Sequence, residues 1–347
     1  MKRPTCRFVL IAVSYAAQCA VAQSSPGALT KTFERVFATS SESSDSAAGW
    51  FCPMHPDVTA TSPGVCSKCG MRLLAGMPFD TREYELDFQT EPAAVQTGKP
   101  THLRLEVREP GTGAVVREFE SVHEKPFHLF VISQDLSIYQ HLHPVIADDG
   151  AWNIDVTLPK PGYYRVLSDF VPKGGSPQMI ARSFATAGYD HDLLSETTVA
   201  VDDAGARVKT IDGITAELQL DPLPLVAGQF GHLDFVLRDS RSGEPIEDLE
   251  PYLGAYGHSL IVRADTLDAV HSHPNEGPDN NIAKGRGGPR VTFEGYLPTP
   301  GLYRAWAQFQ RGGHVSTLMF TFDVLSIEEA FEQRERGIVQ ASAAGAK

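Results

Sequence analysis

One segment, WFCPMHPDVTATSPGVCSKCGM, constrains this chain more than any other because it gathers four side chains of metal-ligating type. A C-x2-H pair and a C-x2-C pair are separated by ten residues: Cys52, His55, Cys66 and Cys69. Two residues between ligands is the span of a tight knuckle turn, which aims two side chains at one ion. Two knuckles joined by a short loop complete a tetrahedral Cys3His set. The spacing predicts a metal-binding module over residues 49–78.

The chemistry of this segment leaves two questions open. A disulfide between two of the three cysteines, with the third free, is the alternative to a metal site. An odd number of cysteines makes it the less favoured interpretation. Met54 and Met71 sit beside the ligands and offer thioethers, which suit Cu(I) or Ag(I). A closed Cys3His set suits Zn(II), so the sequence predicts a copper or zinc ion without deciding between them.

The segment resembles the short heavy-metal-binding domain of copper and silver efflux adaptors and of some copper-transporting P-type ATPases. That family reads CPMHP from an aromatic residue, then PG, then C-P-x-C-G-M-x-L. The matching residues here are Phe51, Cys52, Pro53, Met54, His55, Pro56, Pro63, Gly64, Cys66, Cys69, Gly70, Met71 and Leu73. Ser67 departs from the usual proline, which loosens the second knuckle but removes no ligand. The remaining chain shows no coiled-coil hairpin and no membrane span, so we expect neither an adaptor nor an ATPase.

The N-terminus has the pattern of a cleavable secretory signal over residues 1–22. Lys2, Arg3 and Arg7 precede an apolar run, and an A-x-A site ends at Ala22. Cys19 raises the alternative of lipidation, but Gln18 before it is a poor small-residue site, which favours soluble export to the periplasm or beyond. Residues 23–48 are small and polar and predict a flexible linker.

Charge limits the partners that the exported chain can have. Removing the three basic residues of the signal takes the formal net charge from −13 to −16. So acidic a chain is a poor match for nucleic acid or for an anionic lipid surface. No later apolar run approaches the roughly 20 residues of a membrane-spanning helix.

From Asp80 onward the pattern is β and it repeats. Apolar residues alternate with polar ones in short runs separated by Pro and Gly, as in Leu103, Leu105 and Val107. His128 returns as His258, 130 residues later, and the spacing of the neighbouring histidines is kept. The fold class predicted is therefore mainly β: the knuckle-type module, two tandem immunoglobulin-like or cupredoxin-like sandwiches over residues 79–205 and 206–325, and a C-terminal helix or tail over 326–347. Tyr164 and Tyr303, each after a Pro-Gly turn, resemble the corner tyrosine of such folds. Ser326 and Glu329 predict a capping box for the helix.

The repeated histidines are candidates for second metal sites. Residues two apart on a strand share a face, so His141 and His143 point the same way. If the hairpin turns near Asp135 and Leu136, His128 lies opposite His143 and three imidazoles meet. The second repeat keeps the pattern in His258, His271 and His273. The structural alternative is that these histidines only hydrogen-bond and hold the hairpins, and a one-residue register shift would separate them.

Other histidines are interpreted as structural or superficial. His102 and His232 begin strands, and His123, His191 and His314 have no counterpart in the repeat, so they are expected at the surface. No G-x-S-x-G elbow, Walker loop or H-E-x-x-H motif occurs, which argues against an enzyme.

Together these patterns predict an exported heavy-metal-binding protein, with copper as the favoured ion, that buffers or transfers metal in metal resistance. Its partners would be the ion and a metal efflux system or another extracytoplasmic protein. The alternative is an extracytoplasmic interaction or adaptor protein in which the cluster holds structural zinc and the sandwiches bind a partner.

Overall fold

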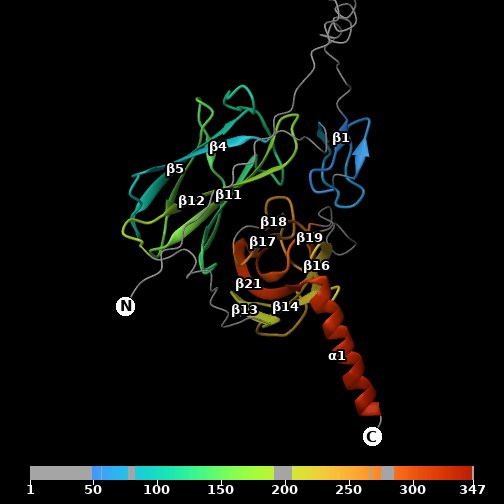
Figure 1. Ribbon diagram of the computed structural model, residues 1–347. Helices are drawn as coiled ribbons and strands as arrows, with labels where there is room; N and C mark the ends of the chain where they lie inside the picture. Colours follow the sequence, from blue (N-terminus) through green and yellow to red (C-terminus); the bar gives the residue numbers. More distant parts are fainter. Residues whose placement is uncertain are drawn as a thin grey trace, which may run out of the picture. The chain divides into compact units, whose positions relative to one another are not determined.

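Alternating apolar residues fold most of this chain into antiparallel strands, as its periodicity predicts. The computed structural model describes residues 49–55, 57–76, 83–190, 205–265, 268–274 and 285–345 (Figure 1). The predicted signal, the linker and His191 lie outside these residues. Among the described residues there is one helix, α1 (Ile327–Gly345), so the mainly β fold class is confirmed. No described helix combines the length and apolar character that a bilayer crossing requires.

The N-terminal module is a three-stranded sheet with two knuckles attached. Its strands are β1 (Trp50–Phe51), β2 (Thr59–Ala60) and β3 (Leu74–Ala75), with β1 in the centre. Phe51 and Leu74 are buried and pack against Val171 and Val122 of the following domain. The module is thereby fixed on the first sandwich through its own sheet.

The first sandwich consists of two antiparallel sheets that share one core. The first sheet has the order β4 (Glu85–Glu91), β5 (Pro100–Arg108), β10 (Trp152–Thr157), β9 (Val145–Ile146). The second has the order β12 (Gln178–Ala185), β11 (Tyr163–Pro172), β7 (Phe127–Ser133), β8 (Tyr139–Leu142), with β6 (Phe119–Glu120) also paired to β11. Leu103 and Leu105 from one sheet and Leu129 and Val131 from the other meet in the core.

The second sandwich repeats this arrangement. One sheet has the order β13 (Val208–Ile211), β14 (Ile214–Asp221), β16 (Gln229–Asp239), β19 (Arg290–Leu297). The other has the order β15 (Leu225–Val226), β21 (His314–Leu325), β20 (Gly301–Arg311), β17 (His258–Arg263), β18 (Ala269–Ser272). The corner tyrosines confirm the equivalence, because Tyr164 donates to the carbonyl of Lys160 and Tyr303 to that of Thr299, each at 2.8 Å.

The two sandwiches pack on each other through strands that are buried on both faces. All seven residues of β7 are buried. Leu129 and Val131 point into their own core, so Phe130 and Ile132 point the other way and meet Leu260, Val262 and Trp306 of the second sandwich. Since side chains two apart share a face, His128 lies on the β7 face that meets the second sandwich.

The C-terminal helix begins as predicted. The Ser326 hydroxyl accepts from the backbone N–H of Glu329 at 3.2 Å, and the Glu329 carboxylate accepts from the N–H of Ser326 at 2.8 Å. This is the reciprocal capping box that satisfies two backbone donors at a helix start.

Candidate metal centre

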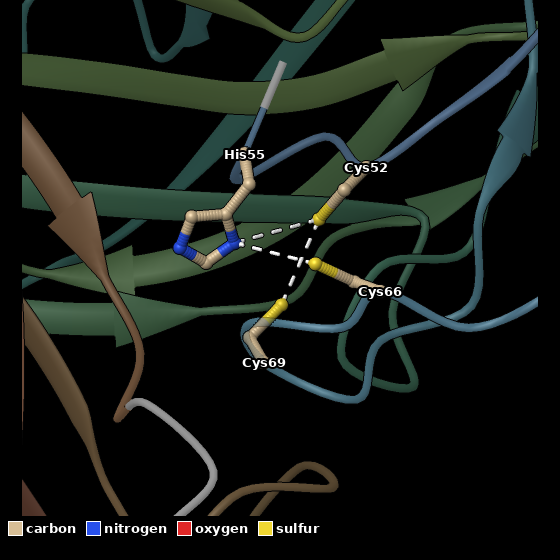
Figure 2. A group of neighbouring side chains, drawn as sticks. All are labelled: Cys52, His55, Cys66 and Cys69. Atoms are coloured by element: carbon tan, nitrogen blue, oxygen red, sulfur yellow. Dashed lines mark hydrogen bonds between the residues drawn. The ribbon is translucent and has the colours of Figure 1, made fainter. Parts of the chain in front are cut away.

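The two knuckles of the N-terminal module bring their four ligand-type side chains to one point. Figure 2 shows the three sulfurs and the His55 ring facing each other. Nδ1 of His55 lies 3.7 Å from Sγ of Cys52 and 3.6 Å from Sγ of Cys66, and Sγ of Cys52 lies 3.6 Å from Sγ of Cys69. Zn–S bonds of 2.3 Å and Zn–N bonds of 2.0–2.1 Å place tetrahedral ligand atoms about 3.5–3.8 Å apart. The four side chains therefore fit one tetrahedral ion.

All three cysteines are free thiols, so no disulfide competes with a metal site among the described residues. The second knuckle closes although Ser67 replaces the usual proline. Gly70 takes a φ of 70° and donates its N–H to the carbonyl of Cys66 at 2.8 Å. The N–H of Lys68 donates to Sγ of Cys66 at 3.4 Å and helps to hold the second knuckle closed.

Burial and hydrogen bonding give the thiols different pKa values. The hydrogen bond from Cys69 lowers the pKa of Cys52 to about 5, against the opposing effect of burial, and His55 lowers it further. The same hydrogen bond raises the pKa of Cys69, which holds the shared proton. A metal ion that binds both sulfurs must displace this proton.

Both methionines predicted as ligands lie next to the cluster and also face a cavity. Met54 and Met71 pack on Cys52, Cys66 and Cys69. A cavity of about 210 Å³ is lined on one side by Met54, His55, Cys69 and Met71, and on the other by His123 and His273. The thiolate cluster thus shares a cavity with histidines of both sandwiches.

The hairpin register predicted for the repeated histidines is confirmed. In β7 and β8, Phe130 pairs with His141 and Leu129 with Leu142, which places His128 opposite His143. One nitrogen each of His128, His141 and His143 lies within 4.8 Å of the other two. In the second repeat, Leu260 pairs with His271 in the same register.

The second repeat gathers a different trio from the one predicted. One nitrogen each of His258 and His273 lies within 4.8 Å of His123, which comes from the first sandwich. His271 instead places Nδ1 2.5 Å from Oδ2 of Asp169. The expectation that His123 is a surface residue is wrong: it is half-buried and stacks on His273 with ring centroids 3.4 Å apart. Leu253 occupies the equivalent position of the second repeat, so the repeat gave no signal for His123.

The other histidines of the described residues behave as expected. His102 pairs with Asp155 at 2.8 Å, and His232 with Glu294 at 3.2 Å, both on the outer faces of their sheets. His314 is exposed.

Burial lowers the pKa of His128 to about 3, of His141 to about 2 and of His143 to about 4. These three imidazoles are therefore neutral at pH 7, the form that binds metal.

Two family models match parts of this chain. Residues 50–75 match the family described as Heavy metal binding domain, so the module is a heavy metal binding domain. Residues 80–186 and 209–326 each match the Domain of unknown function (DUF8832). The chain belongs to this family. No curated protein matches the chain.

Solved structures give only remote similarity. Trypsin-activated alpha-2-macroglobulin from Escherichia coli is 14% identical with a TM-score of 0.22, over 72% of this chain and 16% of that one. A two-domain fibronectin type III segment of chicken tenascin is 10% identical with a TM-score of 0.19, over 70% of this chain and 99% of that one. The chain thus spans about a sixth of the macroglobulin it matches, and neither similarity carries a functional argument.

Proposed function

We propose that this protein is an exported copper-handling protein whose heavy metal binding domain captures the ion and releases it to a second ligand. The observation that carries the proposal is the Cys3His cluster with two thioethers beside it. Three sulfurs and one imidazole lie at tetrahedral separations, and Met54 and Met71 add the soft ligands that select Cu(I).

The cavity supports transfer rather than permanent storage. His55 and Cys69 line it together with both methionines, so two ligands of the set can be approached from one side. A thioether can then accept the ion before the last thiolate releases it. The histidines on the opposite wall offer the next ligands within the same chain.

Export is supported by the signal-type N-terminus. An exported copper carrier would deliver its ion to, or receive it from, a metal efflux system. The proposed role is binding and transfer, without a catalysed reaction.

Metal selectivity tests this proposal. The full-length mature chain is titrated with Cu(I) and with Zn(II) in competition with chromophoric chelators of known affinity. Copper handling predicts that Cu(I) displaces bound Zn(II) and that a Cu(I) chelator removes the copper within minutes. Methionine variants Met54→Leu and Met71→Leu should keep Zn(II) affinity and lose Cu(I) affinity by about tenfold, because only the soft ion uses the thioethers.

A structural zinc site in an interaction protein is the second candidate. The burial of the ligand side chains favours it, since Cys52 is 0% and Cys66 2% exposed and closed Cys3His sets hold zinc tightly. Slow exchange of Zn(II), no displacement by Cu(I) and unfolding of the module on chelation would support this candidate and contradict copper handling.

A further inference from the structure

Seven histidines lie where the two sandwiches meet, far more than a packing interface requires. They come from four segments of the chain and are called the interface histidines below: His123, His128, His141, His143, His258, His271 and His273. Ring centroids of His128 and His271 are 5.0 Å apart, and those of His141 and His258 are 5.8 Å apart. Buried neutral imidazoles can be stabilised by hydrogen bonds, so the test of their role is where each ring nitrogen points.

The hydrogen bonds of the first trio place the lone pairs of two ring nitrogens next to each other. Nε2 of His128 lies 3.0 Å from the carbonyl oxygen of Val122, which only accepts, so this nitrogen carries the proton. Nδ1 of His128 is then a lone pair, and it lies 3.1 Å from Nε2 of His141. The question is whether His141 can donate to it.

His141 donates its ring proton to a different acceptor. Its Nδ1 lies 2.7 Å from Oε1 of Gln308 in the second sandwich. Nε2 of Gln308 donates to the Thr317 hydroxyl at 3.1 Å and the Tyr139 hydroxyl donates to Oε1 at 3.3 Å, which orients the amide with its oxygen toward His141. Nε2 of His141 is therefore also a lone pair. Two lone pairs at 3.1 Å repel each other unless a cation lies between them. For an ion 2.0–2.1 Å from both nitrogens, the nitrogen–ion–nitrogen angle would be about 100°.

The second trio leaves buried nitrogens without partners. His258 is 1% and His273 is 6% exposed, and within the described part of the chain neither ring nitrogen of either residue has a hydrogen-bond partner. Nε2 of His123 is equally without a partner among the described residues. A buried polar atom without a partner destabilises the folded chain, so such a group calls for a ligand. One cation among these three rings would bind one of these nitrogens from each ring.

The surrounding acceptors orient the rings as metal ligands are oriented. Asp169 accepts from Nδ1 of His271, whose Nε2 is buried without a partner among the described residues. The His271 ring lies beside both trios, with its centroid 5.0 Å from that of His128 and 4.3 Å from that of His273. The Gln308 and Val122 oxygens act in the same way on His141 and His128. A fixed acceptor on the far nitrogen of an imidazole sets its tautomer and orients the ring toward a metal.

We propose that the interface of the two sandwiches holds two transition-metal ions of the copper or zinc class. One ion binds His128, His141 and His143, and the other binds His123, His258 and His273. His271, held by Asp169, is available to either ion. Three neutral imidazoles per ion suit Cu(II) best among divalent metals and Zn(II) next. The cavity that His123 and His273 line gives the second ion its access.

This proposal does not depend on copper handling by the N-terminal module. The test therefore uses the full chain, untagged, in a Cys66→Ser, Cys69→Ser background that removes the thiolate site. Cu(II) and Zn(II) are added separately, excess ion is dialysed away, and the metal per chain is measured by mass spectrometry. We expect two ions per chain.

Substitutions of the histidines then show which trio holds each ion. His123→Leu, which installs the residue found at the equivalent position Leu253, should leave one ion. His123→Leu combined with His141→Asn and His143→Asn should leave none. His102→Asn and His314→Asn are matched controls outside the interface and should keep two ions. Melting curves show that each variant is folded.

Electron paramagnetic resonance of the Cu(II)-loaded background provides a measurement that needs no interface variant. The first equivalent should show hyperfine splitting from imidazole nitrogens, and the second should broaden the spectrum because the two trios lie close together. A folded background that binds fewer than two ions, a His123→Leu variant that still binds two, or copper spectra without nitrogen splitting would overturn the proposal.

Discussion

The heavy metal binding domain and the interface histidines bring their metal-ligating side chains together in different ways. The domain takes all four ligands from one short segment, and backbone hydrogen bonds of two knuckles hold them. The interface takes one trio from the β7–β8 hairpin of the first sandwich. The other trio joins His123 of the first sandwich to His258 and His273 of the second, so only the packing of the two sandwiches assembles it. A local site survives whatever the sandwiches do, whereas a composite site exists only while they are packed.

The largest expected effect separates the two sites chemically. Cys66→Ser with Cys69→Ser removes two of four ligands and a shared proton, so tight binding of Cu(I) or Zn(II) by the module should be lost, by about 10³-fold or more. Structural zinc sets contribute roughly 10–16 kcal/mol, and half the set cannot hold the ion. Competition with a chromophoric chelator measures the loss.

The sandwiches should be unaffected by this change. The β-type circular dichroism spectrum and the main melting transition are expected to stay, because their cores contain no residue of the cluster. Unchanged affinity of the module in the double variant would contradict the ligand set.

The next effect breaks the composite site without touching a histidine. Trp306 is 2% exposed and stacks on Tyr139 across the interface with ring centroids 5.0 Å apart. Trp306→Ala should lower the free energy of unfolding by about 3–5 kcal/mol, the usual cost of a large buried aromatic residue. Chemical denaturation measures it.

Metal binding distinguishes the two regions in the same variant. The interface ions should bind more weakly in Trp306→Ala, while the Cys3His cluster keeps its affinity. Leu223→Ala, at an exposed position, is the control. Equal loss at both sites, or at neither, would show that the interface packing does not assemble the histidines.

The sequence predicts the local site more completely than the composite one. The knuckle spacing is local, so it predicts the Cys3His cluster residue by residue, and the hairpin register follows from the two histidine strands alone. The packing of the two tandem domains depends on residues far apart in the chain, so the sequence does not predict it. Comparison of the two repeats does not single out His123 either, because Leu253 stands at the equivalent position of the other copy. One signal was available: FHLFVIS has apolar residues on both faces, which indicates that a second layer covers it.

A third effect concerns acid stability of the metal-free chain. Burial lowers the pKa of His128 to about 3, with His271, His143 and Asp169 facing it. In the unfolded chain its pKa returns to about 6.5, so the unfolded state binds more protons at pH 4–6. Stability should therefore fall as pH decreases from 6.5, by up to about 1.4 kcal/mol per pH unit for such a group.

Denaturation of the metal-free chain at pH 7.5, 6 and 5 measures this slope. His128→Gln should flatten it, since glutamine takes up no proton. A slope that is the same with and without His128 would contradict the burial of a neutral imidazole at this position.

The smallest effect has the opposite sign and comes from a repeated histidine outside the interface. His102 is on the outer face of β5, where hydrogen bonds to Asp155 at 2.8 Å and Asn153 at 3.1 Å raise its pKa. A raised folded pKa means that its contribution is fully present below about 6.5 and is lost as pH rises through the folded value. His102→Gln should therefore lower the melting temperature by about 1–2 °C at pH 5.5 and leave it unchanged at pH 9, because the pair is exposed and weak. A melting difference that grows toward alkaline pH would mean that His102 is buried neutral like the interface histidines, and the contrast between the two classes would fail.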